Sequence, residues 1–360
     1  MIVTFAHHLR PDAFSMEACC LQEAGPLAKE VEAEGVPVTV LGQRNNYDPR
    51  VLPRLIRFLR RGRFHIVHTH LFDADFWGRL AAQTARVPVK ISTIHSPYVD
   101  YQWKNFIADR ALARYTDHFI AVSKTAMEFT QKHISIPQEK FTWIPNPVPA
   151  EGFVDLSVSE QEVEAFCKAW SIDRNAPVVG TIGRLSEQKG YVYLIKAARQ
   201  VVERIPDAQF VVVGEGPKRQ ELETLVREFG LTGRVILTGI QENPRVCYRL
   251  FDLFVLSSLW EGTPLVLIEA MMAGVPVVAT SVDGTLETLS HQETGFLVPP
   301  RDPDSLSNAV LELLSDFSLR SMLAKRAQDY AVSTFDAPLI TRRYEALYLR
   351  LAEQKGLLGR

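Results

Sequence analysis

The segment Leu253-Phe-Val-Leu-Ser-Ser-Leu-Trp-Glu-Gly-Thr-Pro-Leu-Val-Leu-Ile-Glu269 gives the clearest indication of the fold. The apolar run that begins at Leu253 predicts a buried strand. Gly262, Thr263 and Pro264 predict a turn after it. A helix follows, in which Pro264 suits the first position because no N–H is needed there. A buried strand, a turn and a helix in this order are the repeating unit of parallel α/β proteins.

Two carboxylates of this segment, Glu261 and Glu269, lie before and inside the predicted helix. The free amides of a helix N-terminus bind anions. A carboxylate beside such a site needs a partner other than the anion, and sugar or ribose hydroxyls are natural candidates. The segment therefore suggests a nucleotide-sugar site. The alternative is that Glu261 caps the helix and Glu269 is solvated, because acidic residues favour helix starts in any case.

The length and composition are those of a protein with two domains. The chain has 360 residues, of which 46% are hydrophobic and 23% charged, and its net charge of −2 does not favour nucleic acid as a partner. No apolar run of about 18 residues predicts a membrane span, and the N-terminus lacks the order of a signal peptide. The cysteines show no metal-binding spacing, so we expect them to be buried free thiols. Free thiols fit a reducing compartment, and we therefore expect a cytoplasmic protein. The cysteines are Cys19, Cys20, Cys167 and Cys247.

Short apolar runs alternate with helical patterns along the whole chain, which predicts two doubly wound, Rossmann-like domains that face a cleft. We expect an N-terminal domain over residues 1–150, a C-terminal domain over residues 151–335, and a helix over residues 336–360 that packs back on the first domain. The predicted strands span residues 36–40, 65–69, 89–94, 118–122 and 141–144 in the first domain, and 178–182, 209–213, 235–237, 253–257 and 275–279 in the second.

A loop with two cations follows the first predicted strand of the second domain, in the segment Gly183-Arg-Leu-Ser-Glu-Gln-Lys-Gly190. Ligands of open α/β sheets bind at this end of the strands. The planar fork of Arg184 can grip phosphate oxygens and Lys189 adds a mobile point charge, so the pair suits a diphosphate. An exposed basic loop without a ligand is the alternative. The turn Gly214-Glu-Gly216 permits close backbone approach, but it lacks the third glycine of a dinucleotide fingerprint.

These segments, together with Ala273-Gly-Val-Pro-Val-Val-Ala-Thr280 and Gly295-Phe-Leu-Val-Pro299, resemble the motifs of the GT-B glycosyltransferases of family 4, the glycosyl transferases group 1. The resemblance is specific over residues 177–300. It is weaker in the first half, where Val67-His-Thr-His70 and Thr93-Ile-His95 are the best matches. The resemblance implies an enzyme that moves a sugar from a nucleotide-sugar donor to a glycan, lipid-linked or small-molecule acceptor. It further implies a reaction that is retaining and independent of a metal.

The resemblance also assigns roles to residues. By it, Arg184 and Lys189 hold the donor diphosphate and Glu269 bonds the ribose. Glu261 and His95 are the expected catalytic residues beside the reacting sugar. The residues that it assigns to substrate binding are Gly183, Arg184, Lys189, Gly216, Glu261, Gly262, Thr263, Leu265 and Glu269. No cofactor is implied, because fixed cations and a helix N-terminus stabilise the charge that builds on the departing phosphate.

Two other motifs carry metal-binding residue types. Asp73-Ala-Asp75 resembles the paired-aspartate motif of the GT-A glycosyltransferases. Both aspartates open a predicted helix, however, so we expect them to cap its amides. His68 and His70 share one face of a strand. Because no third ligand is near in the sequence, we expect them to be structural or to line the cleft.

The predicted helix from Pro49 to Arg63 is basic and amphipathic. It could lie as a peripheral contact on an anionic membrane, which would suit a lipid-linked acceptor in cell-envelope polysaccharide assembly at the inner membrane face. The interpretation that we favour is an ordinary Rossmann helix that packs its apolar side on the sheet.

The start of the chain departs from the family pattern, which opens with a strand, a glycine-rich loop and a helix. Here residues 1–10 predict a helix already under way, and a strand is predicted over residues 14–21. By ordinary element lengths, we expect the opening strand and glycine loop to account for about 15–25 residues before this helix. We therefore expect Met1 to be an internal methionine of a longer reading frame, which the upstream coding sequence would test.

Two rival functions also fit the sequence. One is a non-catalytic nucleotide-sugar-binding or scaffold protein, which the absent glycine loop favours. The intact set of Arg184, Lys189, Glu261 and Glu269 speaks against it. The other is a different GT-B enzyme: an epimerase, which needs no acceptor, or a glycosyl phosphorylase, which needs free phosphate.

Overall fold

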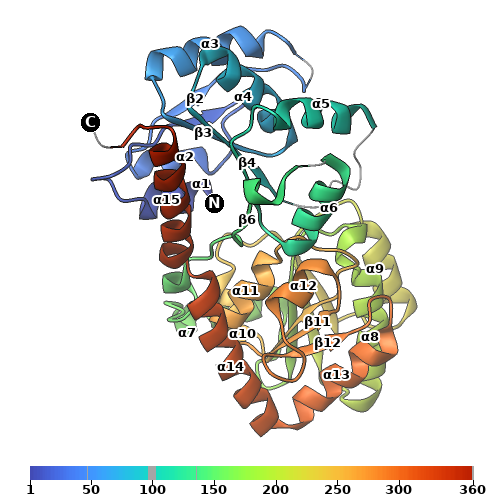
Figure 1. Ribbon diagram of the computed structural model, residues 1–360. Helices are drawn as coiled ribbons and strands as arrows, with labels where there is room; N and C mark the ends of the chain where they lie inside the picture. Colours follow the sequence, from blue (N-terminus) through green and yellow to red (C-terminus); the bar gives the residue numbers. More distant parts are fainter. Residues whose placement is uncertain (47, 96–102, 135, 359–360) are drawn as a thin grey trace. The chain divides into compact units, whose positions relative to one another are not determined.

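The computed structural model describes residues 1–46, 48–95, 103–134 and 136–358 of the 360-residue chain. Two compact units are present, the first made of Met1–Pro147 with the segment from Ala337 onward, the second of Val148–Asp336. Each unit consists of parallel strands with helices between them (Figure 1), which confirms the predicted α/β class with two Rossmann-like domains.

The first unit alternates strands and helices, and the last helix of the chain belongs to it. Its strands are β1 (Ala18–Cys20), β2 (Val38–Val40), β3 (Ile66–His70), β4 (Val89–Ile94), β5 (His118–Ala121) and β6 (Phe141–Trp143). Its helices are α1 (Ile2–His8), α2 (Ala28–Ala33), α3 (Val51–Gly62), α4 (Phe72–Ala85), α5 (Trp103–Ala113), α6 (Lys124–Ile134) and α15 (Ala337–Gln354).

The described strands of the first unit form two parallel sheets, one of β1 with β2 and one in the order β3-β4-β5-β6. Every residue of β4 is buried, as expected for an inner strand of a parallel sheet covered on both faces. The helix predicted at the start of the chain is confirmed as α1. The strand predicted over residues 14–21 is too long, because only Ala18–Cys20 pairs with β2.

Helix α15 contributes to the hydrophobic core of the first unit. Its residues Tyr344 and Tyr348 are buried in one cluster with Phe5 of α1 and Ile91 of β4. The rings of Phe5 and Tyr344 meet edge to face with their centroids 4.8 Å apart, a favourable geometry for an aromatic pair. This core therefore joins segments from both ends of the sequence.

A buried carboxylate ties the segment after α1 to α15. The Glu345 side chain is 2% exposed. Its oxygens accept hydrogen bonds from the backbone N–H of Arg10 at 2.8 Å, from Nε of Arg10 at 2.9 Å, and from Nη1 of Arg342 at 2.7 and 3.0 Å. Burial by itself would raise the pKa of Glu345, but the hydrogen bonds from Arg342 and Arg10 outweigh it and lower the pKa below its ordinary value.

The second unit also alternates strands and helices. Its strands are β7 (Val178–Ile182), β8 (Gln209–Val213), β9 (Val235–Gly239), β10 (Leu253–Leu256), β11 (Val277–Thr280) and β12 (Phe296–Val298). Its helices are α7 (Glu160–Trp170), α8 (Tyr191–Arg204), α9 (Arg219–Glu228), α10 (Arg245–Leu250), α11 (Leu265–Met272), α12 (Asp283–Thr288), α13 (Pro303–Ser315) and α14 (Phe317–Phe335).

The strands of the second unit form a parallel sheet in the order β12-β11-β10-β7-β8-β9. The chain runs from β7 outward through β8 to β9, and then returns to the other side of β7 for β10. The strand order therefore reverses between β7 and β10, and ligands of open α/β sheets bind outside the carboxyl ends of the strands at such a switch point. Strand β12 was not among the predicted strands, because three residues are too few for a periodic pattern.

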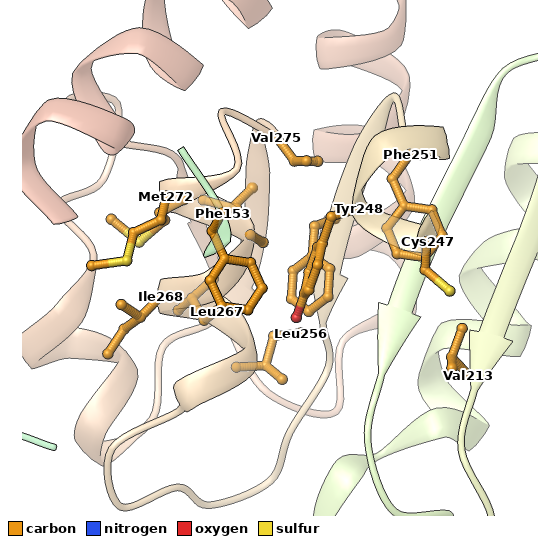
Figure 2. Packing of buried hydrophobic residues seen from close by; sticks show 14 of the residues in the cluster. Phe153, Val213, Cys247, Tyr248, Phe251, Leu256, Leu267, Ile268, Met272 and Val275 are labelled. Atoms are coloured by element: carbon orange, nitrogen blue, oxygen red, sulfur yellow. The ribbon is translucent and has the colours of Figure 1, made fainter. Parts of the chain in front are cut away.

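Tyr248 of α10 lies inside the core on one side of this sheet (Figure 2). It is 1% exposed, and its ring meets the ring of Phe153 edge to face with centroids 5.7 Å apart. Leu256 of β10 and Leu267 of α11 belong to the same cluster. A buried tyrosine hydroxyl needs a partner, and this one donates to Glu269 of α11 over 2.8 Å.

The cysteines of both units are free thiols, as predicted. Cys167 and Cys247 are buried. Cys19 and Cys20 are only half-buried, so the prediction of buried thiols is wrong for these two; they lie on the small two-stranded sheet, which offers little cover. Among the described residues, no helix combines the length and the apolar character that crossing a membrane requires.

We predict that Glu345→Gln lowers the free energy of unfolding by about 1–3 kcal/mol at pH 7, because a charge-assisted hydrogen-bond network is lost. The pKa of Glu345 is lower in the folded state, so its contribution is present above the ordinary value of 4.5 and is lost as the pH falls below it. Urea unfolding at several pH values measures the difference. Exposed Glu353 on α15 supplies the control, Glu353→Gln. An equal loss in both variants, or a loss that is the same at pH 3 and pH 7, would contradict the assignment.

Candidate functional site

Two loops meet at the switch point of the second unit. One runs from Gly183 to Gly190 between β7 and α8, and the other runs from Ser257 to Pro264 between β10 and α11. The backbone N–H of Leu259 donates to the carbonyl of Gln188 at 2.7 Å. The predicted cation loop and the predicted carboxylate segment are therefore neighbours in space.

Glycine allows the loop after β7 to pack directly on the loop after β8. The N–H of Gly183 donates to the carbonyl of Val213 at 2.9 Å, and the N–H of Leu185 donates to the carbonyl of Glu215 at 2.9 Å. A Cβ at Gly216 would lie 2.4 Å from the carbonyl oxygen of Leu185, so no side chain fits there. Gly183 and Gly216 thus shape this edge of the sheet through their backbone.

Lys189 and Glu261, one from each loop, form a buried ion pair. Nζ of Lys189 lies 2.6 Å from Oε1 of Glu261, and the two side chains are 15% and 6% exposed. The hydroxyl of Ser258 donates to the same Oε1 at 2.6 Å. In the part of the chain that the structure describes, Oε2 of Glu261 has no recorded partner. Two donors therefore hold one carboxylate oxygen, and the other can accept a hydrogen bond from a ligand hydroxyl.

The turn between Glu261 and α11 depends on a glycine from α12. The N–H of Gly284 donates to the carbonyl of Glu261 at 3.3 Å, and a Cβ at Gly284 would lie 1.3 Å from the carbonyl oxygen of Gly262. Gly262 and Thr263 are half-buried in this turn. Pro264 is the N-cap of α11, and the prediction of a first helical position is wrong because its ψ of 87° lies outside the helical range.

The start of α11 presents unbonded backbone amides. The amides of Leu267 and Ile268 both donate to the carbonyl of Pro264. Those of Leu265 and Val266 have no acceptor recorded among the described residues, and Leu265 is 40% exposed. Unbonded amides at the exposed start of a helix favour an anionic or oxygen-rich group.

The two carboxylates of the opening segment are held in different ways. Oε2 of Glu269 accepts the hydroxyl hydrogen of Tyr248 at 2.8 Å. Burial raises the pKa of Glu269, although the hydrogen bond from Tyr248 opposes the shift. Glu261 instead has a cation as its partner. Arg184 is exposed, and no ion-pair partner for it is recorded over the described ranges, so its guanidinium is available to a ligand.

Sequence reasoning missed Ser258, Tyr248 and Gly284. Ser258 lies three positions before Glu261, and this short spacing is a signal that the sequence does contain. Tyr248 reaches the carboxylate of Glu269, and Gly284 reaches the backbone of Glu261 and Gly262, only through tertiary packing. No local pattern near Glu261 or Glu269 indicates them.

In the first unit, His95 follows β4 and pairs with His70 at the end of β3. Nδ1 of His70 lies 3.2 Å from Nε2 of His95. Burial lowers the pKa of His95 to about 4 and the pKa of His70 well below its ordinary value, so both rings are neutral near pH 7. His68 is bonded at both nitrogens, Nδ1 to the hydroxyl of Tyr348 at 2.7 Å and Nε2 to that of Thr93 at 2.6 Å. Its structural role is therefore confirmed.

Asp73 and Asp75 lie in the first turn of α4, as predicted, but Asp75 does not cap the helix. The N-cap of α4 is Leu71, which makes no side-chain cap bond. Oδ1 of Asp75 accepts from the hydroxyl of Thr69 at 2.6 Å, and Oδ2 pairs with buried Arg79 at 2.5 Å. The capping prediction is therefore wrong for Asp75, because a buried guanidinium needs the carboxylate as its partner. Over the described residues, no three His, Cys, Asp or Glu side chains are grouped so that they would hold a metal ion.

Helix α3 packs its apolar side into the first unit. Val51, Leu55 and Leu59 are buried, which confirms the ordinary Rossmann helix. With the sheet of β1 and β2, α3 lines a pocket of about 500 Å³. The pocket is lined by Glu17, Thr39, Arg54, Arg57, Phe58, Arg61 and Gly62. Arg57 and Arg61 are exposed, and the described residues show no ion-pair partner for either, so this face of α3 is positively charged.

Two family models match the chain. The model described as Glycosyl transferases group 1 matches residues 162–330, and the model described as Glycosyltransferase Family 4 matches residues 1–151. The first match contains the loops of the switch point, and the second contains His70 and His95.

Relatives of similar length are known. The UDP-Gal:alpha-D-GlcNAc-diphosphoundecaprenol alpha-1,3-galactosyltransferase of Escherichia coli is 28% identical over 96% of this chain and 91% of its own. The alpha-D-kanosaminyltransferase of Streptomyces kanamyceticus is 30% identical over 72% of this chain and 71% of its own. Among solved structures, Anabaena HepE in complex with UDP shares the fold with a TM-score of 0.85 at 22% identity, over 97% of this chain and 96% of its own.

We predict that Lys189→Met destabilises the second unit by about 3 kcal/mol, because it leaves the buried carboxylate of Glu261 without its cation. Adding Glu261→Gln restores most of this loss, since a neutral amide needs no cation. Denaturant unfolding of the single and double variants measures the coupling. Exposed Lys168 on α7 provides the control Lys168→Met. Additive losses in the double variant would mean that the two residues do not stabilise each other.

Proposed function

The chain belongs to the family 4 glycosyltransferases, the glycosyl transferases group 1, and from this premise we propose that the second unit of the enzyme binds a nucleotide-sugar donor at the switch point between β7 and β10. The observation that carries the proposal is the buried pair of Lys189 and Glu261, which keeps one carboxylate oxygen open. Arg184 on the same loop adds a second cation. Two cations beside an open carboxylate oxygen suit a ligand with both a diphosphate and a sugar.

Each residue of the site then has a defined role. Arg184 and Lys189 bind the diphosphate. Oε2 of Glu261 accepts a hydrogen bond from a sugar hydroxyl, and the turn residues Gly262 and Thr263 with the amide of Leu265 meet the same sugar. Glu269 accepts a hydrogen bond from a ribose hydroxyl. The hydrogen bond from Tyr248 orients the carboxylate of Glu269 before the donor binds. This reduces the conformational entropy that is lost on binding.

The reaction breaks the bond between the anomeric carbon and the diphosphate oxygen and the O–H bond of an acceptor hydroxyl. It forms a bond from that carbon to the acceptor oxygen, and the departing diphosphate takes up the proton. Negative charge builds on the diphosphate and is stabilised by Arg184 and Lys189, so we propose that no metal is needed. Positive charge builds on the sugar ring and is stabilised by Glu261. His95 is proposed to contact the reacting sugar. Retention of configuration at the anomeric carbon is proposed from family membership.

We propose a glycan on a lipid carrier as the acceptor and the cytoplasmic membrane face as the place of action. The name of the Escherichia coli relative specifies a diphosphoundecaprenol-linked acceptor for that protein. The exposed arginines of α3 support contact with anionic lipid headgroups. Because Val51, Leu55 and Leu59 are buried in the core, this contact is electrostatic and involves no insertion of the apolar side.

A thermal-shift and donor-hydrolysis screen over UDP-, GDP- and ADP-sugars tests the donor site. We expect one class to raise the melting temperature, because a ligand that binds only the folded state stabilises it. Arg184→Ala should abolish the shift and lower the transfer rate about 100-fold, since a fixed donor to the developing charge is lost.

The control for this screen is Arg199→Ala. Arg199 is an exposed residue of α8 and pairs with Glu203 at 3.3 Å. Arg199→Ala removes one positive charge, as Arg184→Ala does, but at a position away from the switch point. Donor binding and transfer should therefore be unchanged. A donor response that survives in both Arg184→Ala and Lys189→Ala would refute the diphosphate assignment.

Flotation with vesicles tests the membrane contact. We expect binding to vesicles that contain phosphatidylglycerol, and none to pure phosphatidylcholine. Arg57→Gln with Arg61→Gln should weaken binding roughly thirtyfold, from about 1 kcal/mol for each arginine. The matched control is Lys168→Gln with Arg326→Gln, two exposed cations of the second unit. Equal loss in both double variants would show that net charge alone matters.

A further inference from the structure

The contact between His70 and His95 is set by the pairing of two neighbouring strands. In the register of β3 with β4, His68 lies opposite Ile91 and His70 lies opposite Thr93. His95 follows β4 directly, so its ring meets the end of β3, and Nδ1 of His70 comes within 3.2 Å of Nε2 of His95. The contact thus depends on rigid strands.

Both members of this pair are neutral at neutral pH. Burial is the main cause of their lowered pKa values, and for His70 the neighbouring rings of His68 and His95 act in the same direction. A neutral imidazole has one N–H and one lone pair. The hydrogen bond therefore requires that one of the two facing nitrogens carries the proton and the other does not.

The intrinsic tautomer preference of histidine indicates which nitrogen donates. A neutral histidine side chain favours the proton on Nε2 over Nδ1. When both rings adopt this form, Nε2–H of His95 donates to the lone pair on Nδ1 of His70, and neither ring pays a tautomer penalty. Nδ1 of His95 then carries a lone pair. No partner for this Nδ1 is recorded over residues 1–46, 48–95, 103–134 and 136–358.

The ring of His70 packs against the ring of His68. Its centroid lies 4.2 Å from that of His68. His68 is fixed by Tyr348 of α15 at 2.7 Å and by Thr93 of β4 at 2.6 Å. His70 therefore has a rigid neighbour on one side and His95 on the other, as a group that orients another side chain requires.

We propose that His70 is a positioning residue that holds His95 in its Nε2–H tautomer, so that Nδ1 of His95 accepts a hydrogen bond from a hydroxyl group of the sugar substrate. This inference rests on the role proposed above for His95. It adds a selection rule: the enzyme prefers a sugar with a free hydroxyl at that position over the deoxy or O-methyl analogue, because neither analogue can donate the hydrogen bond.

Nitrogen-15 NMR of the histidine rings tests the positioning without any assay of activity. In the wild-type protein we expect His95 to show a protonated Nε2 and an unprotonated Nδ1. His70→Phe keeps a ring but removes the acceptor, so it should shift the Nε2 signal of His95. His70→Asn retains a polar group and should restore part of the wild-type signal. A protonated Nδ1 in the wild-type protein, or unchanged signals in His70→Phe, overturns the proposal.

Transfer kinetics test the consequence for the reaction. His70→Phe should lower kcat about tenfold with little change in KM for the donor, and His70→Asn should recover part of it. The matched control is Thr142→Val, which removes the 2.7 Å hydrogen bond between Thr142 and Nε2 of His118 in the same sheet but no contact of His70 or His95. An equal fall in kcat for Thr142→Val and His70→Phe overturns the proposal, because both would then act through the core. Full activity of His95→Ala overturns the proposed contact of His95 with the sugar. The NMR result shows separately whether His70 and His95 are hydrogen-bonded.

Discussion

A carboxylate that is 6% exposed must have compensating partners inside the protein, and this constraint on Glu261 organises the second unit. Lys189 and Ser258 supply the partners. To bring Lys189 within reach, the loop after β7 has to lie on the loop after β10, and the sheet order allows this only because β7 and β10 are neighbours at the switch point. Gly284 then permits the turn after Glu261 to close against α12. The site is thus prearranged by the protein's own electrostatics and backbone packing.

The candidate site residues of the first unit are neutral, unlike the ion pair of the second unit. The carboxyl ends of β3 and β4 carry His70 and His95, and burial keeps both rings uncharged. Buried carboxylates in this unit are paired, as in Asp75 with Arg79 and in Glu345 with two arginines. The switch point of the second unit offers cations to a ligand, whereas the carboxyl ends of β3 and β4 offer imidazole nitrogens. The difference suits a donor with a diphosphate in one unit and hydroxyl groups of a sugar or an acceptor in the other.

Much of the fold was predictable because long apolar and amphipathic segments are compatible with few secondary structures. The strands around Ile91 and Val211, and the segment from Leu253 to Glu269, appear where their periodicity indicates. The errors fall where local preference competes with tertiary contacts. Asp75 is a good capping residue by type, but buried Arg79 takes its carboxylate. Pro264 was expected inside α11, but the turn closed by Gly284 leaves it one position outside.

The alternation of strands and helices, and the family, can be inferred from the amino-acid sequence alone. So can the motif residues Arg184, Lys189, Glu261 and Glu269. These are properties of short segments, whose periodicity and residue types are local. Three contacts are visible only in the folded protein: Lys189 with Glu261, Tyr248 with Glu269, and His70 with His95. Each of these contacts joins residues from different strands or helices, so its distance depends on sheet order, strand register and backbone packing, which no local pattern contains.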